Sequence, residues 1–264
     1  MVIDFHAHAF PDSLAERAIG VLTSNLTKPI KPVHNGTVSD LTKRMDEWGI
    51  DKSVIVPIVT KKSQTKTLNE WAQSIQNDRI VSFGSIFPHG DEYKQDIDFV
   101  CFLGLKGIKL HAEYQNFDLD SPEMMRIYDY ALSKGLIILH HAGYDYGMPP
   151  PYKSSPRQFA KLAKEFKGGI IIAAHLGGHE QWDDVYEHIC GTDLYIDTSM
   201  GFEYYGEEMF MKIVKKHGAD RILFASDSPW SNAGHDLEAL KKCPLSQDEK
   251  ELILSGNAKR ILEI

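Results

Sequence analysis

The sequence lacks several features that mark whole classes of protein. No apolar run approaches the roughly 18 residues that a membrane-spanning helix needs, and the first four residues show neither the basic nor the apolar part of a secretory signal. The three cysteines, Cys101, Cys190 and Cys243, are few, odd in number and far apart. This usage is typical of buried thiols in a reducing compartment and not of a disulfide framework. We therefore expect a cytoplasmic protein without a membrane partner.

Excess basic charge is missing as well. Lys and Arg total 29 against 37 Asp and Glu, so the formal net charge of −8 disfavours nucleic acid or an anionic membrane surface as a partner. No Gly-x-Gly-x-x-Gly motif follows the first predicted strand, which disfavours a nucleotide-binding protein. The expected partner is a small-molecule substrate, with a homodimer as the base-rate expectation for a soluble enzyme.

Short apolar runs alternate with amphipathic stretches along all 264 residues. Runs that are apolar on both faces are typical of parallel strands covered by helices. Helix signals fill the intervals, with predicted helices at 39–49, 122–135 and 155–168. We expect one α/β domain over residues 1–264, either a closed (β/α)8 barrel or a doubly wound open sheet. The predicted strands are 2–5, 53–58, 80–86, 107–110, 136–139, 169–174, 194–197 and 222–225.

Histidines distinguish the two folds because they follow many predicted strands at the same end. His6 and His8 project from one face of the first strand, since residues i and i+2 of a strand point the same way. In an open sheet such strand ends would spread along a line, whereas in a closed barrel they form a ring at one mouth. The sequence therefore predicts a barrel. The residues that follow later strands are His111, His140, His141, His175 and Asp227.

The same residues suit a divalent metal ion. Two imidazoles on one strand face make a bidentate platform, and Asp227 adds a carboxylate that balances part of the charge. Taken alone, the His-x-His pair also fits surface histidines, and an Asp before Ser-Pro also fits a turn. As a set they indicate one ion, zinc first, with manganese or iron as alternatives, because the ligands are nitrogen and oxygen without cysteine.

Six short motifs extend from residue 3 to residue 262: DFHAH at 4–8, GIKLH at 107–111, HAG at 141–143, AHLGG at 174–178, RILFASDSP at 221–229 and GNAKRIL at 256–262. Their order and spacing resemble the amidohydrolase superfamily, and within it the amidohydrolase-related branch that includes aminocarboxymuconate-semialdehyde decarboxylase. The resemblance implies a single (β/α)8 TIM barrel. It also implies no accessory β-sandwich, because the early position of His6 leaves no room for that domain's N-terminal part.

The resemblance also implies roles for the residues at the barrel mouth. Asp227 and His175 would be catalytic, with Asp227 moving protons and His175 contacting the substrate or the water. His141 is preferred over its neighbour because His-Ala-Gly is similar to the family's His-x-Gly. Since adjacent strand residues face opposite ways, His140 is expected to pack in the outer layer as a hydrogen-bonded core histidine. The implied metal ligands are His6, His8, His141 and Asp227.

The fourth strand leaves two interpretations open. Lys109 and His111 share a face, and in other amidohydrolase branches a carboxylated lysine at this strand bridges two metals. The alternative is that both residues contact the substrate. Aromatic residues near the strand ends favour a small organic, aromatic substrate. The predicted substrate-binding residues are His111, Lys109, Tyr114 and Trp230, while His179 and the other remaining histidines are given no role.

Two reactions fit these residues. The first is hydrolysis of a small organic amide or ester through a metal-activated water. The alternative is non-oxidative decarboxylation of a small, aromatic carboxylic acid, which needs a cation to hold the carboxylate. No arginine falls at a predicted strand end, and this favours hydrolysis. A barrel that binds without turnover is disfavoured because no ligand is lost. The long connections 23–38 and 144–153 are either substrate walls or surface loops.

Overall fold

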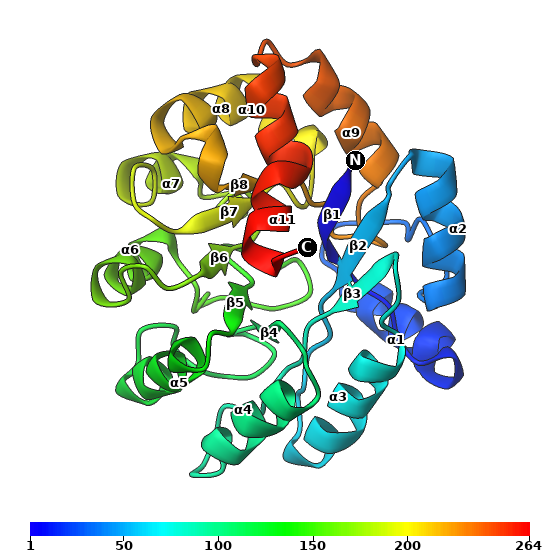
Figure 1. The fold of residues 1–264 in the computed structure, drawn as a ribbon, viewed down its shortest axis with the longest axis vertical. Coiled ribbons are helices and arrows are strands. Elements are labelled where there is room, and N and C mark those ends of the chain that lie inside the picture. The colour runs from blue at the N-terminus through cyan, green and yellow to red at the C-terminus, as the bar shows by residue number, and fades with distance from the viewer.

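The computed structural model describes residues 1–264 and contains eight strands, each short and mostly buried. Figure 1 shows them as a ring at the centre of the molecule with helices around the outside. Each predicted strand overlaps an observed one, and the predicted ends differ by a few residues. The strands are β1 (Ile3–Ala7), β2 (Lys52–Ile55), β3 (Ile80–Ser82), β4 (Gly107–Leu110), β5 (Ile137–His140), β6 (Ile171–Ala173), β7 (Tyr195–Asp197) and β8 (Ile222–Leu223).

The ring closes through two seams. Parallel pairing links β1, β2 and β3 in one sheet and β4 to β8 in another. At the first seam, Phe5 N donates to Phe224 O at 2.9 Å, which joins the first strand to the last. At the second seam, Lys109 N donates to Gly84 O at 2.9 Å, which joins the two sheets beyond β3. The predicted (β/α)8 barrel is therefore confirmed, and the open sheet is excluded.

Helices cover the barrel on the outside, and their ends follow local sequence signals. The Thr37 side chain accepts a hydrogen bond from Asp40 N at the start of α2, and Gly49 ends that helix with φ 73°. Ser121 caps α5 in the same way. The main helices are α1 (Asp12–Ser24), α2 (Val38–Trp48), α3 (Thr65–Ser74), α4 (Tyr93–Phe102), α5 (Pro122–Ser133), α6 (Pro156–Glu165), α7 (Trp182–His188), α8 (Phe202–His217), α9 (Ala233–Lys242), α10 (Gln247–Glu251) and α11 (Asn257–Leu262).

Two apolar clusters divide the core. The larger cluster lies between the strands and the surrounding helices. The smaller one fills the barrel interior and includes Phe5, Leu139 and Ala225. Ile261 and Leu262 of α11 belong to the interior cluster. Figure 1 shows α11 lying across one end of the barrel, the end that faces the viewer. Because the interior and one end are filled, the opposite end, where the strands terminate, is left for a site.

An irregularity in β1 controls which side chains reach that end. Ile3 and Phe5 belong to the interior cluster, so strict alternation would turn Ala7 inward and His6 outward. The pairing register between β1 and β2 shifts between Asp4 and Ala7. As a result Ala7 packs in the outer cluster and His6 lies in the cavity at the strand ends. A bulge of this kind re-aims side chains next to active sites.

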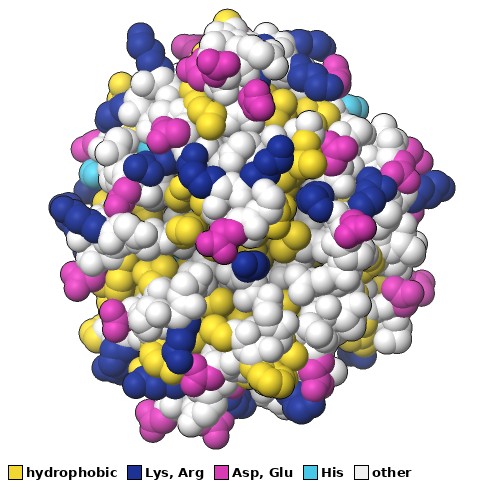
Figure 2. Space-filling view, viewed as in Figure 1, with side chains coloured by type: hydrophobic (Ala, Val, Ile, Leu, Met, Phe, Trp, Pro, Cys, Tyr) yellow, Lys and Arg dark blue, Asp and Glu magenta, His cyan; other side chains and the backbone are white.

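The surface carries charges of both signs. Figure 2 shows basic and acidic side chains interspersed over the face seen in Figure 1, with no extended basic area on it. No helix is both long enough and apolar enough to cross a membrane.

Gly143 lies where the segments after β5 and β6 meet, and its replacement by alanine is predicted to lower the stability of the fold. Its φ is +86°, and a Cβ there would lie 2.2 Å from His179 N. Gly135 has a similar φ of +77° but open space around it. Alanine at either position is destabilised by about 1 kcal/mol or more because of the positive φ. Only Gly143→Ala also forces the backbone of residue 143 away from that of His179. We expect urea denaturation to show Gly143→Ala at least about 2 kcal/mol less stable than Gly135→Ala; equal stability would contradict the prediction.

Candidate active site

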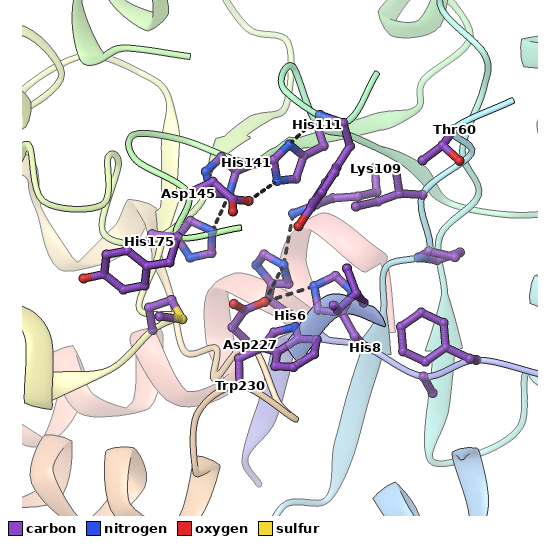
Figure 3. Close-up of a pocket in the computed structure, with 18 of the residues that line it drawn as sticks. His6, His8, Thr60, Lys109, His111, His141, Asp145, His175, Asp227 and Trp230 are labelled. Carbon is purple, nitrogen blue, oxygen red and sulfur yellow. Dashed lines mark hydrogen bonds and ion pairs between the residues drawn. The ribbon is translucent and has the colours of Figure 1, made fainter. Parts of the chain in front are cut away.

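A cavity of about 250 Å³ opens at the ends of the strands. Figure 3 shows that side chains from several strands and loops converge on it. A dry cavity of about 150 Å³ holds a benzene ring, so this one has room for a single substituted ring. All nine residues predicted from the sequence line its wall: His6, His8, Lys109, His111, Tyr114, His141, His175, Asp227 and Trp230.

Three of the four predicted metal ligands form a compact group. Asp227 Oδ1 lies 3.0 Å from His8 Nε2 and 3.3 Å from His6 Nε2. One ligand atom from each of the three lies within 4.8 Å of the others, and the group is largely buried. Two imidazole nitrogens and a carboxylate oxygen turned toward one point fit a divalent ion. His6, His8 and Asp227 can therefore hold a metal.

The fourth predicted ligand, His141, does not join that group. Its Nδ1 lies 2.9 Å from His175 Nε2, and its Nε2 is buried without a hydrogen-bond partner. Burial lowers the pKa of His141 to about 3, so its ring is neutral. The unpartnered nitrogen leaves His141 free to act as a ligand, and the structure places it beside the group.

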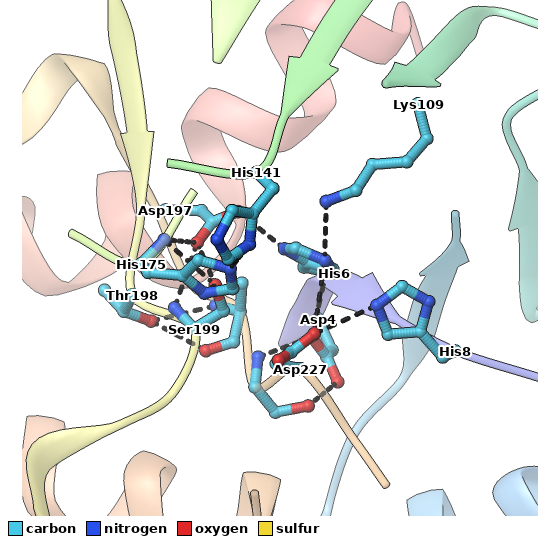
Figure 4. A network of polar contacts seen from close by, with 12 residues as sticks. Asp4, His6, His8, Lys109, His141, His175, Asp197, Thr198, Ser199 and Asp227 are labelled. Atoms are coloured by element: carbon cyan, nitrogen blue, oxygen red, sulfur yellow. Dashed lines mark hydrogen bonds and ion pairs between the residues drawn. The ribbon is translucent and has the colours of Figure 1, made fainter. Parts of the chain in front are cut away.

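Asp197 at the end of β7 fixes two of these rings. Its Oδ2 lies 3.0 Å from His6 Nδ1, which turns His6 Nε2 toward the cavity (Figure 4). Its Oδ1 accepts from His175 N at 3.0 Å and from the Ser199 hydroxyl, and that hydroxyl lies 2.8 Å from His175 Nδ1. A carboxylate behind a histidine fixes the tautomer and orientation of a metal-binding ring. Sequence reasoning missed Asp197, although it ends the seventh predicted strand just as the chosen residues end theirs.

Three residues on the cavity wall have a strained backbone. His175, Met200 and Asp227 all have positive φ values of 59°, 60° and 68°, which side chains other than glycine rarely adopt. All three line the cavity. Such conformations persist only where the surrounding hydrogen bonds enforce them, and they occur preferentially at functional sites.

Lys109 is wholly buried, and its Nζ lies 3.0 Å from His6 Nε2. Burial lowers the pKa of Lys109 to about 8, while the charges of Asp227 and Asp197 oppose that effect. The amine is therefore still mostly protonated at pH 7. It is the one lysine or arginine on the cavity wall, in agreement with the expectation that no arginine reaches the site.

His111 is held between two carboxylates. Its Nε2 lies 2.9 Å from Asp145 Oδ2 (Figure 3). Its Nδ1 lies 3.3 Å from Glu113 Oε2. Burial alone would lower the pKa of His111, but these hydrogen bonds outweigh it and raise the pKa. The ring also stacks on His141, with centroids 4.1 Å apart and 12° between planes. His111, Glu113 and His141 thus form a second buried group, whose possible ligand atoms lie within 4.8 Å of one another.

The outer wall of the cavity is apolar. Thr27 N donates to Tyr146 O at 2.8 Å, which joins the two long connections over the cavity. Both connections therefore form walls of the cavity, and their role as substrate walls stays a prediction. Asp145 of the second connection is a further wall residue that sequence reasoning missed, because a loop gives no periodic signal. The apolar wall residues include Leu22, Leu26, Ile30, Ile58, Leu68, Trp71 and Trp230.

Comparison of the sequence with models of known protein families identifies the family of this chain. The amidohydrolase model (Amidohydro_2) matches residues 3–264. The chain belongs to the amidohydrolase family. This match confirms the family predicted from the motifs, and with it an enzyme as the class of protein. No curated protein sequence matches the chain.

Solved structures of low sequence identity share the fold of this amidohydrolase. The 5-carboxyvanillate decarboxylase LigW from Sphingomonas paucimobilis is 15% identical with a TM-score of 0.75, covering 100% of this chain and 99% of that one. A dihydroxybenzoic acid decarboxylase from Polaromonas sp., with bound manganese and 2-nitroresorcinol, is 16% identical with a TM-score of 0.70, covering 99% and 96%. A probable 2-pyrone-4,6-dicarboxylic acid hydrolase from Acinetobacter baumannii is 16% identical with a TM-score of 0.69, covering 100% and 99%. These matches confirm a TIM barrel without an extra domain.

Asp197 is expected to set metal affinity through His6. In Asp197→Asn, the amide keeps the size of the side chain but loses the charge that polarises the ring. We expect the dissociation constant for zinc, measured by competition with a chromophoric chelator, to rise by roughly 10- to 100-fold. Asp129→Asn, on the exposed face of α5, is the matched control and should leave it unchanged. Unaltered affinity in Asp197→Asn would exclude this positioning role.

Asp236 in α9 predicts a pH dependence of stability. Burial raises the pKa of Asp236 to about 7, against an ordinary value near 4, although Phe202 N and Ser231 Oγ hydrogen-bond it. The folded protein thus keeps a proton that the unfolded chain releases between about pH 4 and 7. The free energy of unfolding should therefore fall as pH rises through this window, by up to about 4 kcal/mol from this group.

Asp236→Asn removes the titrating group and keeps its shape, so it should lose this contribution. Its urea midpoint relative to wild type should rise from about pH 4 to about pH 7 and then level off. Asp91→Asn, at an exposed position, should follow the wild-type curve. Parallel curves for wild type and Asp236→Asn would show that Asp236 is already ionised in the folded state.

Proposed function

We propose that this amidohydrolase is a metal-dependent, non-oxidative decarboxylase of a small, aromatic carboxylic acid. The observation that carries the proposal is the buried ammonium of Lys109, the one lysine or arginine on an otherwise largely apolar wall. A carboxylate entering the cavity needs a cation to replace its hydration, and Lys109 lies beside His6 where it supplies one. A neutral amide or ester has no such need.

The similar folds support the same choice. Both decarboxylases named above act, by their names, on aromatic acids, and one holds manganese together with an aromatic inhibitor. A cavity of about 250 Å³ with an apolar outer wall suits a substituted ring. The sequence alone favoured hydrolysis because no arginine was expected at the site to hold a carboxylate. The buried Lys109 can supply that cation, which weakens the argument.

The proposed reaction breaks the bond between the ring carbon and the carboxyl carbon. The carboxylate leaves as CO2, the bonding electron pair stays on the ring carbon, and a proton takes the vacated position. A divalent ion on His6, His8 and Asp227, with His141 beside them, would act as a Lewis acid toward a substrate oxygen. Lys109 would hold the carboxylate, and His175 or Asp227 would supply the proton.

Ser199 and Asp197 prepare His175 for this work. The Ser199 hydroxyl donates to Asp197 Oδ1, so its oxygen accepts from His175 Nδ1–H. The other nitrogen, Nε2, then faces His141 within the cavity. The chain of contacts holds the ring in one orientation and leaves Nε2 without a proton of its own. His175 would therefore first take up a proton at Nε2 and then deliver it to the ring carbon.

Isotope labelling tests the proposal. The zinc- or manganese-loaded protein is incubated in D2O with hydroxybenzoates, and NMR follows both the released CO2 and deuterium at the former carboxyl position. We expect deuterated, decarboxylated product. His175→Gln should lower kcat by about 100-fold or more, whereas His235→Gln, outside the cavity, should not. Release of no CO2 from any acid of the panel would count against decarboxylation.

Hydrolysis of a small organic amide or ester remains the second candidate. It is supported by the lack of arginine on the cavity wall and by the hydrolase among the similar folds. In H2¹⁸O, a hydrolase would place one ¹⁸O in the carboxyl group of the acid product, and no CO2 would be released. Elemental analysis adds a further distinction: one ion per chain fits the three-residue group, whereas two ions would favour a carboxylated Lys109 that bridges them.

A further inference from the structure

His179 is a cavity residue that nothing in the proposed reaction uses. Its side chain lies on the cavity wall and is only 2% exposed. Neither Nδ1 nor Nε2 has a hydrogen-bond partner. A neutral imidazole carries one N–H donor and one acceptor, and a buried polar group left unpaired costs free energy. His140 is also unpaired, but it packs behind β5 and away from the cavity, whereas the unpaired ring of His179 lies on the cavity wall. At that position a molecule in the cavity can supply the missing partner.

The backbone of His179 is fixed from both sides. His179 N donates to Ala142 O at 2.9 Å, and Tyr144 N donates to His179 O at 3.1 Å. These bonds attach it to the end of β5, and the missing side chain of Gly143 permits the close approach. The ring is therefore positioned by the barrel and not by a free loop.

Aromatic rings surround His179 without satisfying it. Tyr146, Tyr204 and Trp182 approach it edge to face, with centroids 4.9, 5.2 and 5.6 Å away. The polar atoms of Tyr146 and Trp182 are already hydrogen-bonded to other residues. The Tyr146 hydroxyl pairs with Glu180 and Lys28, and Trp182 Nε1 donates to His175 O. The cage thus orients the ring and leaves its nitrogens for another partner.

The ring is neutral, which limits what it can bind. Burial lowers the pKa of His179 to about 4, although the charges of Glu180 and Asp227 partly oppose this. A neutral ring beside carboxylates gives little attraction to an anion. A hydroxyl, in contrast, both donates and accepts, as the imidazole does.

We propose that His179 is a specificity-determining residue that hydrogen-bonds an uncharged hydroxyl or carbonyl group on the substrate, away from the metal ligands. The distances allow one molecule to reach both places. The His175 ring lies 6.0 Å from His179 and 5.4 Å from His6, centroid to centroid. The inference rests on the proposed function only in taking this cavity as the substrate site.

Phenol and toluene provide the test, because they share a shape and differ by one hydroxyl. Their dissociation constants are measured by NMR titration of the zinc-loaded protein. Wild type should bind phenol roughly three- to tenfold tighter, the size expected for one neutral hydrogen bond. His179→Phe should lose this preference, because the ring remains and both nitrogens are gone. His179→Gln, which restores a donor and an acceptor, should recover part of it.

The outcomes separate the two proposals. A phenol preference that survives in folded His179→Phe, with unchanged zinc content, overturns the role of His179 and leaves the proposed function intact. Equal affinity of wild type for phenol and toluene also overturns the role of His179 and leaves the proposed function intact. Binding of neither probe by wild type overturns the cavity as a site for aromatic rings and so counts against the proposed function as well. The ring ¹⁵N resonances of His179 should shift with phenol and not with toluene.

Discussion

The carboxylate of Asp197 is the contact on which the arrangement of the site depends. It binds His6 from β1, the backbone of His175 after β6, and Ser199 after its own strand. Segments that follow or belong to three different strands thus share one buried anion. Burial raises its pKa, and the surrounding hydrogen bonds and Lys109 oppose that rise. A buried charge remains stable only with such partners, so placing it at the barrel mouth fixes the rings around it.

The charge balance around the cavity favours a cation. Carboxylates outnumber the cationic side chains, and burial prevents water from screening the excess. A divalent ion on His6, His8 and Asp227 would compensate part of this negative charge. The carboxylates are those of Glu113, Asp197 and Asp227, which are buried, and of Asp145, which is half-buried. The basic side chains are those of Lys109 and His111, both buried.

The sequence allowed a reliable prediction of the barrel and of the residues at its mouth, because both depend on local patterns. Apolar runs mark strands buried on both faces, and polar residues at their ends mark the open end of the barrel. The β1 bulge has no such pattern, because it arises from pairing with β2. His140 illustrates the same limit. It packs in the outer layer against Tyr128 and Phe159 as expected, but neither of its nitrogens is hydrogen-bonded, contrary to the expectation.

The seam between the first and last strands has a consequence for synthesis. Ser226 donates to Asp4 across 222 positions of the chain, and β1 pairs with the segment after β8. A nascent chain exposes His6 and His8 early, yet the ring cannot close until the final strand has left the ribosome. Domains with such distant contacts fold slowly. The two histidines therefore meet Asp227 only in a nearly complete polypeptide, so fragments released prematurely lack the assembled ligand group and expose an open sheet edge to quality control.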